Sequence, residues 1–167
     1  MVIRPATSGD HAAIRAVNLD AFPTAEEADL VDALRANGDD LVELVAVQDE
    51  VVIGHILFTR LGLAGENDTV PGAALAPVAV SPERQNQGVG GRLIVDGVEA
   101  CRRLGVAAVV VLGHPAYYPR HGFSAQAAKQ LHDPFDAGDA FMAMELKEGA
   151  LNRPRRPLYA APFGIAA

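Results

Sequence analysis

Hydrophobic and polar positions repeat along the chain with two different periods. Runs of apolar and β-branched residues predict strands, and these runs lie at 2–4, 41–47, 51–61, 73–80, 106–112 and 141–146, with a weaker one at 129–132. Apolar residues spaced by three or four predict helices, which start near Thr7, at 25–35 and at 88–104, with room for one more turn at 116–121. Because helices interrupt strands of mixed direction, this order predicts a mixed α/β (α+β) fold.

Local signals define several of these boundaries. Thr7 places a side-chain oxygen at a helix start with an acid three residues on, and Pro23 ends that helix. The short polar segment 48–50 between two apolar runs predicts a tight β-hairpin. Residues 62–72 are polar and contain glycine, so we expect a loop there. The run 73–80 has almost no polar residue, which predicts a strand buried on both faces.

The composition of the chain changes after Lys147. We therefore expect a domain over 1–147 and a C-terminal tail over 148–167. The prolines of 152–157 exclude a helix or a central strand in that segment. Tyr159 and Phe163 give the tail two aromatic side chains, which predicts that it packs back onto the domain or onto a partner.

Composition and charge exclude several classes of protein. The formal net charge is −7 and the isoelectric point is near 5.1, which argues against a nucleic-acid or anionic-membrane binder. Cys101 is the only cysteine, so neither a disulfide framework nor a cysteine-rich zinc site is available. The longest apolar run, 106–112, is far too short to span a membrane, and the N-terminus lacks a signal-peptide pattern. We expect a soluble cytoplasmic protein.

The most informative segment, 76–93, passes from an apolar strand through a turn into a glycine-rich helix start. Glycine allows a ligand to approach the backbone closely, and a helix N-terminus offers free N–H groups and a positive dipole end. Together these features predict an anion site suited to a pyrophosphate, to which Arg84 and Arg92 can add positive charge. The P-loop pattern is absent, since the chain has no Gly-Lys pair, and the dinucleotide fingerprint fails because its third glycine position is Leu93.

Two motifs in order give the chain a resemblance to a known family. The stretch 85–90 has the form Gln-x-x-Gly-x-Gly after a strand that ends with Val-Ala-Val at 78–80, and 118–123 has the form Tyr-x-x-x-Gly-Phe. With these motifs the sequence resembles the GNAT superfamily of acetyl-CoA-dependent N-acetyltransferases over roughly 1–146. The run 112–118 is similar to one bacterial branch of it, the YhbS-like acetyltransferases.

The resemblance implies a fold, a cofactor and a reaction. It implies a mixed, largely antiparallel sheet of about six to seven strands that splays at the cofactor site, flanked by about four helices. It implies acetyl-CoA as the cofactor and transfer of the acetyl group to a primary amine of a small molecule or peptide, by direct attack in a ternary complex. Relatives often pair as homodimers, although this sequence shows no interface, and no nucleic-acid or membrane partner is expected.

The resemblance also assigns roles to matched positions. Tyr118 would lie near the sulfur of CoA and act as the general acid toward the leaving thiolate, while a backbone N–H near Val78 would stabilise the oxyanion. The positions implied in cofactor binding are Val78, Val80, Gln85, Gln87, Gly88, Val89, Gly90, Gly91 and Arg92. The adjacent Tyr117 is an alternative to Tyr118, which we favour because its spacing to Gly122 fits the motif.

Other candidate residues have structural explanations that are at least as good. For Glu26 and Glu27, candidates for a general base, a solvated helix start is the better explanation. His114 follows a central strand, where either a functional histidine or a turn residue is expected. Structural or solvated roles are the better explanation for the remaining candidates, His55, Cys101, Arg153, Arg155 and Arg156.

Two further functions remain open at this point. The lack of an identifiable general base leaves a non-catalytic acyl-CoA sensor or structural protein on the same fold as an alternative. A weaker alternative is an enzyme that acetylates aminoacyl-tRNA, against which the net charge counts. Acceptor specificity is expected in segments 22–35, 60–72 and 124–139, and nothing in them names an amine.

Overall fold

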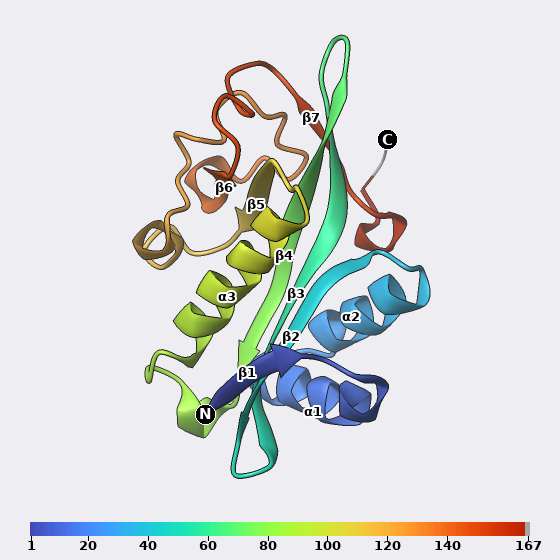
Figure 1. Cartoon of the computed structure of the whole chain (residues 1–167), viewed down its shortest axis with the longest axis vertical. Coiled ribbons are helices and arrows are strands. Elements are labelled where there is room, and N and C mark those ends of the chain that lie inside the picture. The colour runs from blue at the N-terminus through green and yellow to red at the C-terminus, as the bar shows by residue number, and fades with distance from the viewer. Residues whose placement is uncertain (166–167) are drawn as a thin grey trace.

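A seven-stranded sheet forms the centre of the computed structural model, which describes residues 1–165 (Figure 1). Six strands follow the order β1-β2-β3-β4-β5-β6, and β7 pairs with the outer part of β3. The strands are β1 (Val2–Pro5), β2 (Asp40–Gln48), β3 (Val51–Ala64), β4 (Thr69–Val80), β5 (Ala108–Leu112), β6 (Phe141–Glu145) and β7 (Arg156–Leu158). The helices are α1 (His11–Ala21), α2 (Glu26–Ala36) and α3 (Val89–Arg103).

The mixed α/β class predicted from the sequence is confirmed. All neighbouring strands pair antiparallel except β4 and β5, which run parallel. The described chain has three α-helices rather than about four, because the predicted turn at 116–121 is a short 3₁₀ helix over Tyr118–His121. The hairpin turn between β2 and β3 is formed by Asp49 and Glu50, which both have positive φ.

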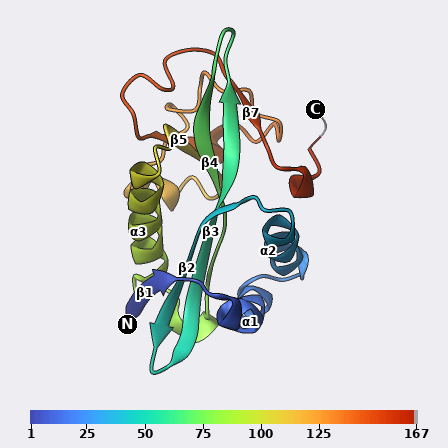
Figure 2. The same cartoon turned by 45° about the vertical axis from the view of Figure 1, so that its right-hand side comes forward.

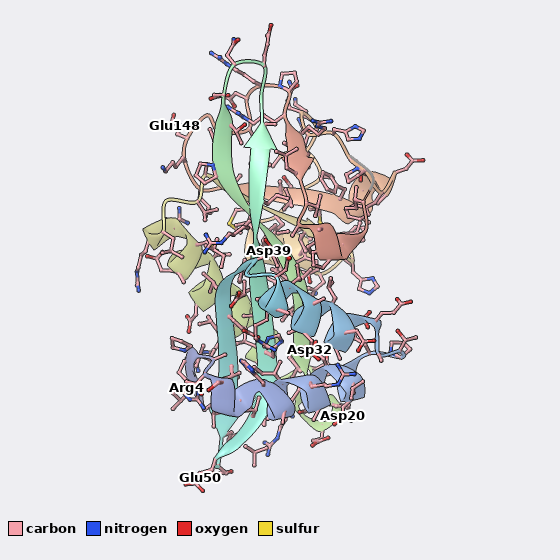
Figure 3. All side chains as sticks on the ribbon, turned by 90° about the vertical axis from the view of Figure 1, so that its right-hand side faces the viewer. Arg4, Asp20, Asp32, Asp39, Glu50 and Glu148 are labelled. Carbon is pink, nitrogen blue, oxygen red and sulfur yellow. The ribbon has the colours of Figure 1, made fainter. Side chains whose placement is uncertain are left out.

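Helices cover both faces of the sheet (Figure 2). On one face, α1 and α2 lie side by side (Figure 3), and Ile14, Val31 and Leu34 pack against Val45 and Leu57 of the sheet. On the other face, α3 contributes a buried apolar stripe, as predicted, to a core that includes residues of all the central strands. That stripe consists of Val89, Leu93, Ile94, Val98 and Cys101.

Two predictions about local structure are wrong. Residues 62–72 are not a loop, because β3 continues to Ala64 and β4 begins at Thr69, which leaves only 65–68 as the turn. We call residues 62–72 the arm; its two strands are held together by their pairing. Leu63 is buried in an apolar cluster, but the glycines near it in the sequence made the segment resemble a loop. Residues 129–132 form no strand, since only Leu131 makes an isolated bridge, to Arg155.

The parallel pairing between β4 and β5 is short, and this opens the sheet. It joins Gly72–Leu75 to 108–111, whereas β4 continues to Val80. Over that extension, Ser81 and Ile53 are hydrogen-bonded to each other, since the backbone N–H of Ser81 donates to the Ile53 carbonyl at 2.9 Å. The pairing of β4 with β3 keeps the same register from Val80 back to Val78. Hydrogen-bonded and non-hydrogen-bonded pairs alternate in an antiparallel ladder. The backbone groups of Val78 and Val80 therefore point away from β3, into the gap where β5 no longer pairs.

The C-terminal segment packs along the domain. Strand β7 lies beside the arm of β3, opposite β4, and Arg155 just before it bonds both the Asp68 carboxylate and the Leu63 carbonyl. Tyr159 stacks edge-on against Phe135 and Phe163, at centroid distances of 5.3 Å in both cases. Within the part of the chain that the structure describes, no helix is long and apolar enough to cross a membrane.

Candidate active site

A cavity of about 600 Å³ opens at the end of β4, where the sheet splays. It lies between that strand, the turn and first residues of α3, the end of α1, and the 3₁₀ helix after β5. Eight of the ten predicted site residues line it, namely Val78, Val80, Gln85, Gly88, Val89, Gly90, Gly91 and Tyr118. The other two, Gln87 and Arg92, are exposed and do not line the cavity.

The turn that precedes α3 is built from residues that tolerate left-handed backbone. Asn86 has a φ of 61° and Gly88 a φ of 84°. Gln85 fixes the turn to the strand, because its side chain donates to the Val80 carbonyl at 3.0 Å, and Gln87 donates to the Glu83 carbonyl at 3.1 Å. No atom lies within 4 Å of where a Cβ on Gly88 would be, so this side of the turn is open to a ligand. The first N–H groups of α3 are thus presented to an anion.

Tyr118 stands in the wall of the cavity with its ring in the core. It is 8% exposed and packs edge-on against Phe123, and its ring occupies the space where a side chain at Gly113 would project. Burial, with a smaller contribution from Tyr117, raises the pKa of Tyr118 to about 12. The phenol is therefore protonated at neutral pH, which is the form that can donate a proton.

The charged side chains in this cavity are all basic. Arg84 and Arg120 line it together with His114 and His121, and none of its described lining residues is Asp or Glu. Arg84 donates to the Gln48 side-chain oxygen at 3.2 Å and Arg120 to the Ala116 carbonyl at 3.4 Å, so both bond neutral acceptors. In a chain with a net charge of −7, a cavity with this lining favours an anionic ligand.

The remaining candidates lie elsewhere. Glu26 and Glu27 are on the first turn of α2 and do not line the cavity. Cys101 is fully buried, and burial raises the pKa of its thiol to about 12, which makes it a small core residue. Arg153 and Arg156 are exposed, whereas Arg155 is held by Asp68 and is not a solvated tail residue.

His55 belongs to a buried network behind the site. Its Nε2 bonds Glu43 at 2.9 Å and its Nδ1 faces the side-chain amide of Asn18 at 3.1 Å. That amide nitrogen also donates to the Ile14 carbonyl, so Nδ1 accepts and the imidazole is neutral. Burial agrees with this assignment, since it lowers the pKa of His55 more strongly than the Glu43 carboxylate raises it.

Three lining residues outside the glycine turn were not predicted to bind a ligand: Ala21, Arg120 and His121. Ala21 closes one side of the cavity from the end of α1, beside Phe22, which begins the segment 22–35 where acceptor specificity is expected. Ala21 leaves no signal in the sequence, because a small residue at a helix end is ordinary. Arg120 and His121 fill variable positions of the Tyr-x-x-x-Gly-Phe motif. Their spacing from Tyr117 by three and four residues was the available signal, since it places them on one side of a helical turn.

Comparison with known proteins agrees with this geometry. A family model described as Acetyltransferase (GNAT) family matches residues 11–123, which is more than half of the chain. The chain belongs to the acetyltransferase (GNAT) family. The match ends at Phe123, so it includes the glycine turn, α3 and the tyrosine motif of this GNAT protein.

Two curated relatives come from Escherichia coli. The uncharacterized N-acetyltransferase YjhQ of strain K12 is 47% identical over 116 residues, which is 68% of this chain and 64% of that protein. The match therefore spans less than two thirds of YjhQ. The uncharacterized N-acetyltransferase YhbS of the same strain is 35% identical over 154 residues, which is 91% of each chain.

Two solved structures share the whole fold of this GNAT protein. Escherichia coli YhbS in complex with CoA aligns with a TM-score of 0.90 and 31% identity, covering 99% of this chain and 93% of that one. A GNAT family acetyltransferase from Brucella melitensis in complex with acetyl-CoA aligns with a TM-score of 0.80 and 32% identity, covering 97% of each chain. The predicted resemblance to the family and to its YhbS-like branch is confirmed.

Proposed function

We propose that the protein transfers the acetyl group of acetyl-CoA to a primary amine of a small molecule or peptide. The observation that carries the proposal is the cavity where the sheet splays. It combines the glycine turn, a lining whose described residues include no Asp or Glu, and the neutral phenol of Tyr118. These features suit an anionic cofactor whose reactive end lies beside a proton donor. Relatives solved with CoA and with acetyl-CoA support the choice of cofactor.

Each part of the cavity has a task in this proposal. The N–H groups at the start of α3, around Gly88 and Gly90, would hold the pyrophosphate, and Arg84 would add charge. The backbone groups of Val78 and the backbone N–H of Val80, which point away from β3, would bind the amides of the pantetheine arm, in the way a neighbouring strand would. Acetyl-CoA supplies an activated acetyl thioester.

The residues where the sheet splays would stabilise the charges that form during acetyl transfer. A neutral amine attacks the thioester carbonyl, the new N–C bond forms, and a backbone N–H near Val78 stabilises the negative oxygen. As the C–S bond breaks, the Tyr118 hydroxyl gives its proton to the departing sulfur. The amine loses its own proton to water or to His114, which is exposed in the same cavity.

Calorimetric titration with acetyl-CoA is the first test, with CoA and ATP as comparison ligands. We expect micromolar binding of acetyl-CoA and CoA, and weaker binding of ATP. Gly88→Glu should abolish binding of both, because it puts a negatively charged side chain at the open face of the turn, at a position whose φ of 84° favours glycine. If purified wild-type protein binds acetyl-CoA no better than ATP, the proposed cofactor site is wrong.

A non-catalytic acyl-CoA sensor on the same fold is the second candidate. The observation in its favour is that no carboxylate side chain among the described residues lines the cavity to act as a base. Turnover separates the two candidates. Release of CoA that depends on an added amine, and that falls in Tyr118→Phe, supports the transferase. Tight binding without any such release across a panel of primary amines supports the sensor.

A further inference from the structure

One wall of the cavity is a compact stack of three side chains from the segment after β5. The ring of Tyr117 contacts both Arg120 and His121: the guanidinium carbon is 5.3 Å from the ring centroid, and the imidazole centroid is 4.9 Å away on a tilted plane. Arg120 follows Tyr117 by three residues, and side chains three residues apart lie on the same side of a 3₁₀ turn. A guanidinium over an aromatic face is held in place by cation–π attraction.

The side chains of this wall pack against two glycines in the first turn of α3. A Cβ at Gly90 would lie 2.9 Å from the Tyr117 hydroxyl oxygen, and a Cβ at Gly91 would lie 2.9 Å from Cε1 of His121. Gly88 has no such neighbour. The three glycines therefore have different roles: Gly88 forms the turn and leaves it open, while Gly90 and Gly91 provide room for the side chains of Tyr117 and His121.

This packing brings the positive charge of Arg120 close to the N–H groups proposed to bind the anion. Because the Tyr117 hydroxyl abuts Gly90, the guanidinium stacked on that ring lines the same cavity as the start of α3. Among the described residues, Arg120 has no carboxylate within ion-pair distance, and its side chain is exposed to the cavity. Nε2 of His121 is buried in the same wall without a hydrogen-bond partner, an arrangement that is costly unless a polar group completes it.

We propose that Tyr117, Arg120 and His121 form the second side of a phosphate clamp, in which Arg120 pairs with a phosphate of the cofactor opposite the glycine turn. This inference rests on the proposed function, since it concerns the same cofactor site. Arg120 is the binding residue, and Tyr117 is a positioning residue that holds the guanidinium through its ring. The resemblance to the family implies that the N–H groups of Gln87–Gly91 hold the pyrophosphate, and it assigns no phosphate contact to Arg120.

The test is a calorimetric comparison of Arg120→Gln with wild type, using acetyl-CoA and S-acetylpantetheine, which lacks phosphate. Arg120→Gln should weaken acetyl-CoA binding about tenfold, as expected for one charge-assisted pair, and leave S-acetylpantetheine binding unchanged. The loss should shrink at high salt, because screening weakens the pair in the wild type. Arg103→Gln is the matched control, since Arg103 is an exposed arginine at the far end of α3, and it should bind acetyl-CoA normally.

A third ligand identifies the phosphate. With 3′-dephospho-CoA, the tenfold loss persists if Arg120 pairs with the pyrophosphate and disappears if it pairs with the 3′-phosphate, and either result supports the clamp. Tyr117→Ala should lose as much affinity as Arg120→Gln, and the double variant should lose no more than either one. Tyr117→Phe, which keeps the ring, should restore most of the affinity that Tyr117→Ala loses.

The outcomes separate this inference from the proposed function. If wild-type protein does not bind acetyl-CoA, the proposed function fails. If wild type binds it and Arg120→Gln binds equally well, only the clamp is overturned. An equal loss for S-acetylpantetheine in Arg120→Gln also overturns it, because the residue then contacts a part of the cofactor that carries no phosphate.

Discussion

Two adjacent tyrosines in the cavity have different environments. Tyr118 is set into the core between Gly113 and Phe123, whereas Tyr117 is half-buried and carries Arg120 on its ring. Burial raises the pKa of both hydroxyls, and in Tyr117 the charge of Arg120 opposes that rise. A fixed neutral phenol suits proton donation, and a ring that holds an arginine suits binding. The two residues are therefore expected to affect different kinetic constants.

Replacement of Tyr118 by phenylalanine removes the proposed acid and keeps the ring. We expect kcat to fall about a hundredfold with little change in KM, because loss of a general acid affects the departure of the thiolate rather than binding. Steady-state CoA release with a reactive amine measures both constants. Tyr159→Phe is the control: this tyrosine is partly buried and packs on Phe135, outside the cavity, and the change should leave kcat unaltered.

At the scale of elements, the distance between α3 and the sheet is set by glycines. A Cβ at Gly97 would lie 2.2 Å from Cε2 of Phe58, a ring that is fully buried in β3. On the strand side, a Cβ at Gly54 would lie 3.0 Å from both Leu93 and Val89 of α3. Close approach of α3 to β3 depends on these positions, and this approach places the first turn of α3 at the end of β4.

Gly97→Ala should therefore destabilise the protein, although alanine is the better helix former. The intrinsic gain is about 1 kcal/mol, whereas forcing a methyl group into a closed core typically costs about 1–3 kcal/mol, and a contact as close as this one lies at the upper end. Urea denaturation of the purified variant measures the sum. A double variant with Phe58→Leu should lose less stability than the two single changes together; simple additivity would contradict the packing argument.

Elements with strong local signals could be predicted from the sequence, and those defined by long-range pairing could not. The hairpin at 48–50 and the apolar stripe of α3 follow from short-range patterns, and both are confirmed. The arm at 62–72 could not be predicted, because its strands are stabilised by pairing with each other and with β7. The pairing of β7 depends on a contact between residues far apart in the chain.

The candidate site divides in the same way. The glycine turn is a local motif, so the spacing of residues along the chain is enough to identify Gly88 and Gly90. It is not enough for Arg120, because the place of this residue in the cavity wall depends on a ring contact with Tyr117 and on the packing of that segment beside α3. Sequence motifs predict the backbone segment that lines the cavity. The side chains that reach the cavity from another element can be identified only once the fold is known.

For the whole molecule, the tail and the arm of β3 and β4 form one unit. Arg155 joins them, with its side chain 8% exposed and hydrogen bonds to Asp68, to the Leu63 carbonyl and to the Ala150 carbonyl. The bonds to Asp68 and Leu63 link segments that are about half the chain apart. Stability of the outer part of the sheet should depend on this single guanidinium.

Arg155→Ala should reduce the free energy of unfolding by about 2 kcal/mol, since it leaves two partly buried carbonyls and a carboxylate without their donor. Asp68→Asn is the milder comparison. It removes only the charge of an exposed partner and should cost less than about 1 kcal/mol. Chemical denaturation of both variants provides the test, and equal losses would mean that the carbonyl contacts contribute nothing.

Acid should unfold the protein through the network under α1 and α2. Burial opposes ionisation of Glu43, but hydrogen bonds from His55 and Arg35 outweigh it and lower its pKa from an ordinary 4.5 to about 2. Its contribution to stability is thus present above pH 4.5 and is lost as the pH falls toward 2. Burial lowers the pKa of His55, so the unfolded state also gains a proton there below pH 6.5, which acts in the same direction.

Thermal unfolding measured between neutral and low pH tests this sign. Wild type should lose stability progressively on acidification, first through His55 and then, below pH 4.5, through Glu43. Glu43→Gln should be less stable at neutral pH and should show a flatter loss below pH 4.5. Glu148→Gln, at an exposed surface position (Figure 3), should follow the wild-type curve. A variant curve parallel to wild type for Glu43→Gln would contradict the assignment.

The contact between the Tyr118 ring and Gly113 has a consequence for how the two positions evolve. A Cβ at position 113 would lie 2.3 Å from Cε2 of the tyrosine, so no larger residue fits while the ring is present. A lineage that replaces Tyr118 by a residue without an aromatic ring is released from this restriction, and substitution of Gly113 should follow. Across related sequences, the loss of the ring and the loss of the glycine should therefore occur together. A glycine retained at 113 then marks the descendants that have kept an aromatic ring at 118.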